Sequence, residues 1–198
     1  MLTFDEATHT YTYGGVVVPS VTQVLKPLTN YGMIPSDKLE VARQKGVAVH
    51  KMVELHANGD LDVETLPDWM RPVLVQWERF VADTGFVMIV SEHRVYHPNY
   101  GYAGTLDLFG TMEKAREAAF IDVKRSFFAS SIIGLQLAGY HEAYCAQEKV
   151  GKNAKNAARY ALRLNENGPY RLEPFTDKKD FGDFVTALAF HKLKERHQ

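Results

Sequence analysis

The sequence predicts a mixed α/β fold in the order αβββαβ, preceded by an extra hairpin and helices. Aliphatic and polar residues alternate in 104–109 and 120–124, as in strands that bury one face. Apolar residues recur at helical spacing in 36–57 and 132–147, on either side of these strands. A chain of 198 residues is long enough for a substantial core, and we expect one domain spanning 1–198.

The N-terminal region is predicted to form a hairpin and a short helix. Residues 3–18 contain two apolar stretches around a Gly-Gly pair at 14–15, which favours a tight turn. Ser20 and Gln23 have the spacing of a capping box, so a helix is expected to run from there to Leu25.

Two longer helices are expected before the strands. Ser36 or Asp37 can cap the first, which we expect to end near Ala57. The second is expected to open at residues 67–68 and to end at Gly85. It carries aromatic side chains at helical spacing, which we interpret as core residues: Trp69, Trp77 and Phe80.

Pairing of the three central strands brings acidic residues together. A symmetrical turn around residues 114–115 places Asp107 opposite Asp122. A turn at 98–101 places Glu92 opposite Asp107. Like charges directly opposite each other are unfavourable, so a compensating charge is expected. A divalent cation with oxygen ligands is the simplest candidate. A bulge would break this register, so three unrelated surface acids remain the alternative.

Side chains on the flanking helices are candidates for the same site. Gly46 and His50 lie one turn apart, and a glycine inside a helix costs about 1 kcal/mol relative to alanine. Close approach of another backbone or of a ligand would explain it. His50 is either a packed core residue or a ligand. Gln136 and Tyr140 are also one turn apart, and Gln136 needs a partner, either Tyr140 or a substrate.

The C-terminal part is predicted to end in a hairpin and a helix. Residues 151–156 read as a basic loop, followed by a strand at 157–164 and its hairpin partner at 171–175. Thr176 or Asp177 is expected to cap the last helix, and Ser130 or Ser131 the helix before the loop.

Composition excludes some classes of protein. A formal net charge of −1 neither favours nor excludes nucleic acid, because a local basic patch can coexist with neutrality. The single cysteine, Cys145, excludes an internal disulfide and suits the cytoplasm. No apolar run has membrane-spanning length, and the N-terminus lacks a signal-peptide pattern, so we expect no membrane partner.

Four segments, in order, resemble the PD-(D/E)XK nuclease superfamily, specifically its RecB-like exonuclease branch of phage and bacterial type. They are GVAVH at 46–50, GTLD at 104–107, DVK at 122–124 and QLAGY at 136–140. PSVTQVL at 19–25 is similar to the N-terminal segment of phage-borne members. The resemblance implies a restriction-endonuclease-like core with the αβββαβ order.

The resemblance also implies a metal site. Asp107 and Asp122 would ligate one or two Mg²⁺ or Mn²⁺ ions, together with the carbonyl of Val123. His50 would be an additional ligand. Glu92 matches an acid on the preceding strand that binds metal directly or through water.

A catalytic set follows from the same resemblance. Lys124 would be the catalytic lysine, acting with Asp107 and Asp122, and Gln136 and Tyr140 would help to position DNA. The chemistry is consistent, because metal-assisted phosphodiester hydrolysis uses hard oxygen ligands and a positive charge near the attacking water.

The chain departs from the family pattern in places. Some RecB-like nucleases hold an iron–sulfur cluster with four cysteines, and the lone Cys145 excludes that cofactor here. Val123 and Arg125 stand where many members have an aromatic residue and a threonine. No helicase motif accompanies the segments, so any recombinase, single-strand-binding protein or helicase would be a separate partner.

Basic residues near these segments are candidates for contacts with DNA phosphates. The alternative for each is a solvated surface charge. The candidates are Arg125, Lys149, Lys152, Lys155, Arg159 and Arg163.

We therefore expect a Mg²⁺- or Mn²⁺-dependent DNA exonuclease for recombination or end processing, in the cytoplasm of a bacterial or phage-infected cell. A structure-selective endonuclease of the same fold is the first alternative. A non-catalytic DNA-end or protein-binding module is the second, and the set Asp107, Asp122 and Lys124 argues against it. A hydrolase of small phosphates would not need Gln136 and Tyr140.

Overall fold

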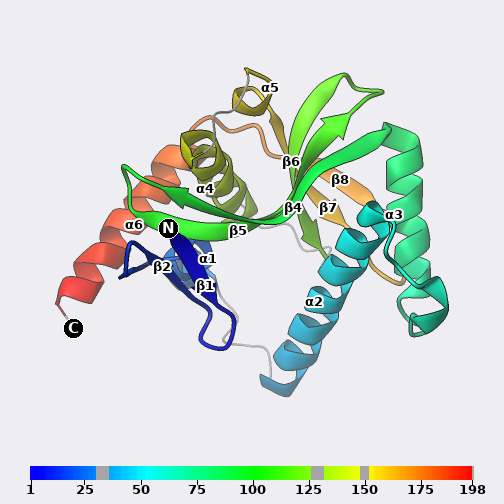
Figure 1. The fold of residues 1–198 in the computed structure, drawn as a ribbon, viewed down its shortest axis with the longest axis horizontal. Helices are drawn as coiled ribbons and strands as arrows, with labels where there is room; N and C mark the ends of the chain where they lie inside the picture. The colour runs from blue at the N-terminus through cyan, green and yellow to red at the C-terminus, as the bar shows by residue number, and fades with distance from the viewer. Residues whose placement is uncertain (30–35, 126–131, 148–151, 198) are drawn as a thin grey trace.

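The computed structural model describes residues 1–29, 36–125, 132–147 and 152–197, which form two sheets and their covering helices (Figure 1). The strands are β1 (Leu2–Asp5), β2 (Thr10–Tyr13), β3 (Val16–Val18), β4 (Phe86–His97), β5 (Tyr102–Met112), β6 (Glu117–Lys124), β7 (Ala158–Arg163) and β8 (Arg171–Pro174). The helices are α1 (Val21–Leu25), α2 (Ser36–Asn58), α3 (Arg71–Thr84), α4 (Ile132–Gln147), α5 (Lys152–Lys155) and α6 (Asp180–Arg196), with 3₁₀ turns at Lys26–Leu28 and Val63–Thr65.

The larger sheet has the strand order β4-β5-β6-β7-β8. β6 and β7 are parallel, and the other neighbours are antiparallel. Parallel neighbours need a crossover connection, and here α4 and α5 lie between them in sequence. The succession α2, β4, β5, β6, α4, β7 is the predicted αβββαβ core of restriction-endonuclease-like type, with α3 inserted before β4.

The predicted register of the central strands is confirmed. Leu108 faces Ile121 across β5 and β6, and Ser91 faces Leu108 across β4 and β5. The register shift in β4 lies between Met88 and Val90, outside the acidic segment. The three carboxylates therefore fall on adjacent positions of neighbouring strands.

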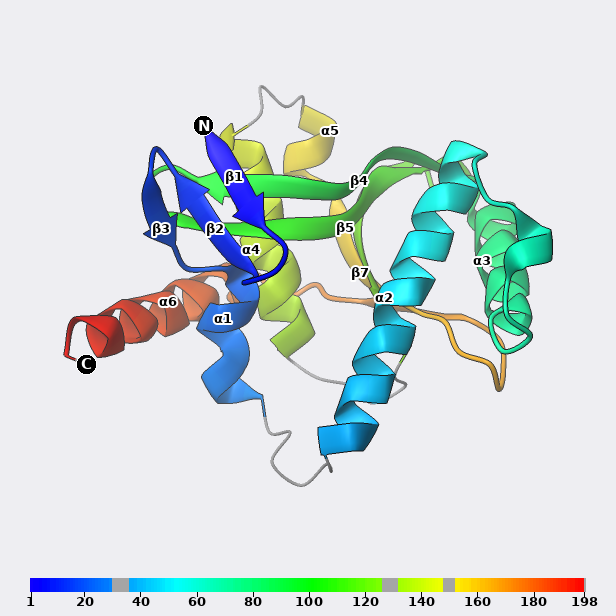
Figure 2. The same cartoon turned by 60° about the horizontal axis from the view of Figure 1, so that its bottom comes forward.

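Helices cover both faces of the sheet. One core cluster joins α1, α4 and α6 to the sheet through Val21, Leu137 and Phe184, and a second joins α2 and α3 through Val49 and Trp77. Figure 2 shows α2 and α3 on one side of the molecule and α1, α4 and α6 on the other. β6 is buried on both faces, which explains its nearly continuous apolar sequence. None of the described helices is both long and apolar enough to cross a membrane.

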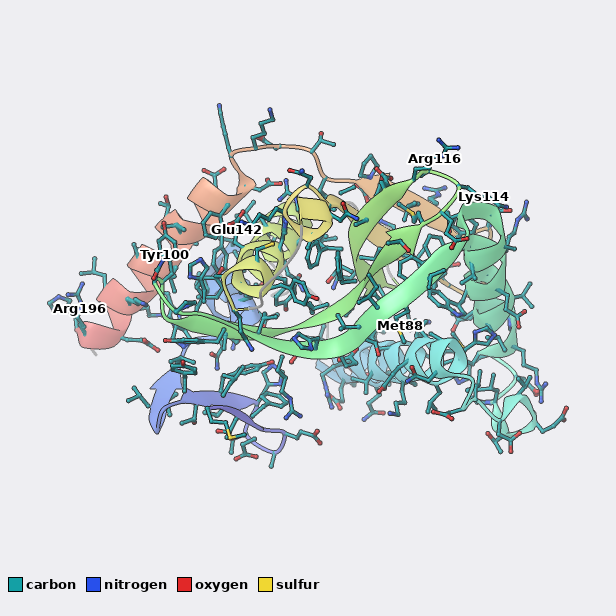
Figure 3. The ribbon with its side chains drawn as sticks, turned by 45° about the horizontal axis from the view of Figure 1, so that its top comes forward. Met88, Tyr100, Lys114, Arg116, Glu142 and Arg196 are labelled. Atoms are coloured by element: carbon teal, nitrogen blue, oxygen red, sulfur yellow. The ribbon has the colours of Figure 1, made fainter. Side chains whose placement is uncertain are left out.

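β4 and β5 form a long curved ribbon (Figure 3). One end turns at Tyr100 beside α6, where Lys192 Nζ donates to the Tyr100 carbonyl at 2.6 Å. At the other end β5 turns into β6 at Lys114, beside α3, where Lys114 Nζ donates to the Ala82 carbonyl. The middle of the ribbon, between these anchors, carries the acidic residues.

The N-terminus forms a three-stranded sheet where the sequence predicted a hairpin, because residues 2–5 pair with β2 as an additional strand. The capping box of Ser20 and Gln23 is confirmed. This unit is joined to β5: Ala103 N donates to the Pro19 carbonyl at 2.9 Å. The N-terminal sheet is thereby fixed beside the strand that carries Asp107.

Several predicted boundaries are wrong. α3 begins at Arg71, since Pro72 sets its first turn and Trp69 lies in the turn before it. The expected basic loop contains the short helix α5. α6 begins at Asp180, because Asp177 accepts from the Lys179 amide in a local turn and caps no helix. The proposed caps Ser130 and Ser131, and the basic residue Lys149, lie outside the described residues.

Candidate active site

Three side chains from three elements meet at the middle of the curved ribbon. His50 comes from α2, Glu92 from β4 and Asp107 from β5, and one ligand atom of each lies within 4.8 Å of the others. The Nδ1 atom of His50 is 3.3 Å from Glu92 Oε1 and 3.6 Å from Asp107 Oδ2. The structure thus brings together residues that are 57 positions apart in sequence, His50 and Asp107.

His50 is held from its other side as well. Its Nε2 atom lies 2.9 Å from the carbonyl oxygen of Val123 on β6. Burial disfavours the charged imidazole, but the neighbouring Asp107 and Glu92 carboxylates outweigh burial and raise the pKa of His50 to about 9. Without a bound cation, a protonated His50 therefore supplies the positive charge that these carboxylates require.

Asp107 also ties two strands together. Its Oδ2 atom accepts a hydrogen bond from the Val123 amide at 2.7 Å. The β5–β6 ladder ends at the Leu108–Ile121 pair, so this carboxylate satisfies a backbone amide just beyond the ladder. The bond fixes the side chain of Asp107 toward β6.

Glu92 has an unusual backbone for a strand residue. Its φ is 45°, in the left-handed region that side chains other than glycine rarely adopt. Such a conformation costs about 1–2 kcal/mol. The neighbouring pairs Ser91–Leu108 and His93–Leu106 keep the predicted register on both sides of it. The strain is thus confined to the residue whose carboxylate contacts His50.

Asp122 lies deeper than the other acids, with a side chain only 1% exposed. Lys124 Nζ lies 2.9 Å from its Oδ1 and 2.7 Å from its Oδ2. Burial raises the pKa of Asp122 to about 6, with Asp107 acting in the same direction, although Lys124 opposes the rise. Asp122 and Lys124 form a tight pair at the end of β6.

Gln136 and Tyr140 support this pair from α4. Gln136 Nε2 donates to Asp122 Oδ1 at 3.0 Å and lies 3.4 Å from the Tyr140 hydroxyl. Burial, with added repulsion from Asp107 and Asp122, raises the pKa of Tyr140, so its phenol stays neutral. A Cβ atom at Gly104 would lie 2.5 Å from the Tyr140 ring, so glycine is required at that position of GTLD. The sequence predicted that Gln136 needs a hydrogen-bond partner, either Tyr140 or a substrate. In the structure its partners are Asp122 and Tyr140.

The donor set suits a hard divalent cation. Carboxylate oxygens are the ligands that Mg²⁺ and Mn²⁺ prefer, and an imidazole nitrogen is compatible with Mn²⁺. His50, Glu92 and Asp107 are close enough to share one ion, with the Val123 carbonyl beside them. Asp122 lies outside this group, with its oxygens directed to Lys124 and Gln136. At Gly46, an added Cβ would meet nothing within 4 Å, so among the described residues no second backbone explains that glycine.

The basic residues proposed for DNA contacts differ in position and in exposure. Arg125 follows the Asp122–Lys124 pair and lies at the same end of β6. The prediction for Arg163 is wrong: its side chain is 3% exposed and paired with Glu173 at 2.6 Å, because β8 covers it. Arg159 pairs with Asp180 at 3.0 Å near the opposite end of β7.

Lys155 is exposed on α5, which precedes the N-terminal end of β7. The parallel register sets Lys124 beside Arg163 and Ala119 beside Ala158, so α5 lies at the far end of the sheet from Lys124. The side chain of Lys152 lies outside the described residues. The structure therefore does not bring Lys155 to the acidic site.

Sequence reasoning missed a group next to the site. Glu166 Oε1 is 3.1 Å from Lys45 Nζ and 2.8 Å from Arg125 Nη2. Both cations lie over the ring of Trp69, at 4.7 Å and 5.4 Å from its centre. Lys45 directly precedes the GVAVH segment, and this position is the one feature of the sequence that could have placed Lys45 near the site. Glu166 carried none, because its place depends on the parallel β6–β7 pairing.

Comparisons with known proteins give a distant structural likeness. No protein-family model matches the chain, and no curated protein matches it. Among solved structures, it is similar to an alkaline exonuclease (LHK-Exo) from Laribacter hongkongensis, with 11% identity and a TM-score of 0.48 over 88% of this chain and 86% of that chain. A structure of LHK-Exo in complex with dAMP gives 11% identity and a TM-score of 0.43 over 89% and 87% of the two chains. At such low similarity, a functional assignment has to rest on the geometry of the site itself.

Proposed function

We propose that this protein is a DNA exonuclease that depends on Mg²⁺ or Mn²⁺ and acts in DNA-end processing or recombination. One observation carries the proposal: His50, Glu92 and Asp107 converge within 4.8 Å, directly beside the buried Asp122–Lys124 pair. Metal-assisted hydrolysis of a phosphodiester requires both parts, an oxygen-rich cation site and an adjacent positive charge.

In this proposal, His50, Glu92 and Asp107 hold the cation, with the Val123 carbonyl and Asp122 completing the set. A bound divalent cation supplies an activated water and neutralises charge on the phosphate. His50 releases its proton when the cation binds, because only the neutral imidazole has a free lone pair. Asp107 keeps its orientation through the bond from the Val123 amide.

Lys124 has the role of the positioned charge. Its Nζ is fixed by both oxygens of Asp122, and its side chain remains partly accessible to a substrate. A lysine in this place stabilises the attacking hydroxide or the negative charge that grows on the phosphate. Gln136 and Tyr140 act as positioning residues, because they fix Asp122 from the interior.

The test compares linear DNA with covalently closed circular DNA, each with Mg²⁺, Mn²⁺ or EDTA. We expect degradation of the linear DNA alone, only with a metal, and none by Lys124→Ala. Lys114→Ala is the matched control, because it removes the same charge at the far turn of the ribbon and should leave the activity unchanged.

Each outcome decides between proposals. Cutting of the circle would replace the exonuclease with a structure-selective endonuclease on the same site. Full activity of Lys124→Ala would overturn the assigned role of the lysine. Absence of cleavage with any metal, in protein shown to be folded by circular dichroism, would reject catalysis on DNA.

A further inference from the structure

Beside the candidate active site lies a group that we call the Glu166 cluster: Lys45, Trp69, Arg125 and Glu166. A single oxygen, Glu166 Oε1, contacts both cations, at 3.1 Å and 2.8 Å. Two positive charges therefore share one negative charge. The cluster keeps a net charge of +1 at neutral pH.

The cluster is at the same end of the sheet as the catalytic lysine. Arg125 directly follows Lys124, and β7 sets Arg163 beside Lys124, three residues before Glu166. Lys45 lies on α2, the helix that also carries His50. The cluster and the candidate active site therefore border each other through adjacent residues of β6 and through α2, as neighbouring phosphates of one DNA strand would require.

The geometry of the cluster matches what a phosphate needs. Its cations are reachable, since the side chains of Lys45 and Arg125 are 35% and 18% exposed. The Nε atom of Arg125 is buried and has no hydrogen-bond partner among the described residues, so this guanidinium depends on its Nη2 contact with Glu166 for a hydrogen-bonded anion. Trp69 lies under both cations and limits their side-chain freedom.

Glu166 occupies the place of an anion in this arrangement. Burial works against its charge, but the hydrogen bond from Lys45 and the charge of Arg125 lower the pKa of Glu166, so it is ionised. A carboxylate and a phosphate present similar oxygen acceptors to an arginine. An arriving phosphate has to compete with Glu166 for the same donors.

We propose that Lys45 and Arg125 form a binding subsite for a backbone phosphate of the DNA strand, and that Glu166 is an internal counter-ion that DNA displaces. The inference rests on the proposed action on DNA and adds a specific prediction: removal of an acidic residue tightens binding. The more deeply buried Arg163–Glu173 pair lacks this property, because its arginine is 3% exposed.

The experiment measures binding of a fluorescein-labelled blunt duplex by anisotropy, with Mg²⁺, in a Lys124→Ala background that prevents cleavage. We expect Glu166→Gln to lower the Kd about 3- to 10-fold, and Lys45→Ala and Arg125→Ala each to raise it. Each of the two alanine variants should also reduce the slope of log Kd against log salt by about 0.9, the value for one phosphate contact.

The matched control is Glu40→Gln. It makes the same change of charge and releases Arg43 from an exposed pair at 2.7 Å on the N-terminal part of α2. We expect its Kd to stay within about twofold, because a general gain of one positive charge is a small, screened effect. An equal tightening by both variants would mean that only net charge matters and would overturn the subsite.

Turnover of linear DNA gives a second measurement. With Lys124 restored, Glu166→Gln should lower KM and leave kcat unchanged. An unchanged or weaker affinity of folded Glu166→Gln, while the wild type still degrades DNA, would assign Glu166 a purely structural role and overturn the inference. Failure of the wild type to bind or cut DNA would instead refute the proposed function.

Discussion

The two halves of the site are built in opposite ways. In the outer half, Glu92 is 39% exposed and strained, and it faces His50, which is protonated without a cation. In the inner half, Asp122 is 1% exposed and already has two side-chain partners, Lys124 and Gln136. The outer half still needs a cation for its two carboxylates, whereas the buried acid of the inner half already has a lysine and an amide donor beside it.

This difference separates two tasks, binding of the cation and positioning of the lysine. The outer half must exchange a proton for a cation, so its donors tolerate exposure and backbone strain. The inner half must keep one lysine in one place, so the acid that holds the lysine is buried and hydrogen-bonded from α4. Substitutions in the two halves should therefore affect different measurements.

The largest expected effect is in the inner half. Lys124→Met keeps the length of the side chain but removes its charge, and we expect kcat to fall about 100- to 1,000-fold, as for the loss of one transition-state donor. Metal affinity, measured by calorimetry, should change little, because Lys124 is not among the cation ligands. A large loss of metal affinity would show that the two halves are not separable.

The next effect is in the outer half. His50→Ala should weaken binding of Mn²⁺ about 10- to 100-fold, because it removes a ligand and the residue that orders the carboxylates. Calorimetric titration measures this directly. Gln136→Ala is the contrasting variant, since it removes one hydrogen bond to Asp122 and touches none of the other acids, so it should weaken Mn²⁺ binding less than His50→Ala does.

A pH series sharpens the same contrast. His50 is protonated below its pKa of about 9, so metal binding releases a proton. The apparent Kd for Mg²⁺ should fall about tenfold per pH unit between pH 7 and 9 and then level off. A slope that persists in His50→Ala would assign the proton to another group.

The stability of the metal-free protein should change with pH in the opposite direction to metal affinity: it should fall as the pH rises. A histidine whose pKa rises on folding, here from 6.5 to about 9, stabilises the protein fully below pH 6.5 and loses that contribution as the pH passes 9. The metal-free protein should thus melt at a lower temperature at pH 10 than at pH 6.5, as thermal unfolding can show. In His50→Ala this decrease should be smaller.

The smallest effect concerns strain. Glu92→Gly removes a side chain that disfavours positive φ. At pH 10, where His50 is largely neutral and its pairing with Glu92 contributes little, we expect the metal-free protein to gain about 1 kcal/mol in stability, and the variant to lose metal affinity. Chemical denaturation measures the gain. Glu54→Gly does not share the positive φ, so destabilisation there and stabilisation at Glu92 would isolate the backbone term.

The sequence was sufficient to predict the register of the central strands, but not which residues cover the strands at the edge of the sheet. The turn positions set Asp107 and Asp122 on adjacent strands, because the register shift falls at Met88 and Val90, away from them. Arg163 was misjudged, since alternation along a strand does not tell whether a second face is covered, and here Glu173 of β8 covers it.

Two features of the site depended on information that a local pattern does not contain. The left-handed backbone of Glu92 could not be predicted, because no glycine or turn residue stands at this position. The conformation arises within a strand whose neighbouring pairs keep their register. The Glu166 cluster depends on a parallel pairing formed across α4 and α5. Such pairing is set by tertiary packing, so spacing along the chain cannot predict it.

The connections of the large sheet also indicate the order in which its parts fold. β4, β5 and β6 are joined by short turns, whereas β7 pairs with β6 only after the chain has passed through α4 and α5. Local pairings close faster than distant ones, so we expect the meander to form early and His50 on α2 to dock onto it late. A cation that requires His50 would then slow unfolding and leave the folding rate almost unchanged.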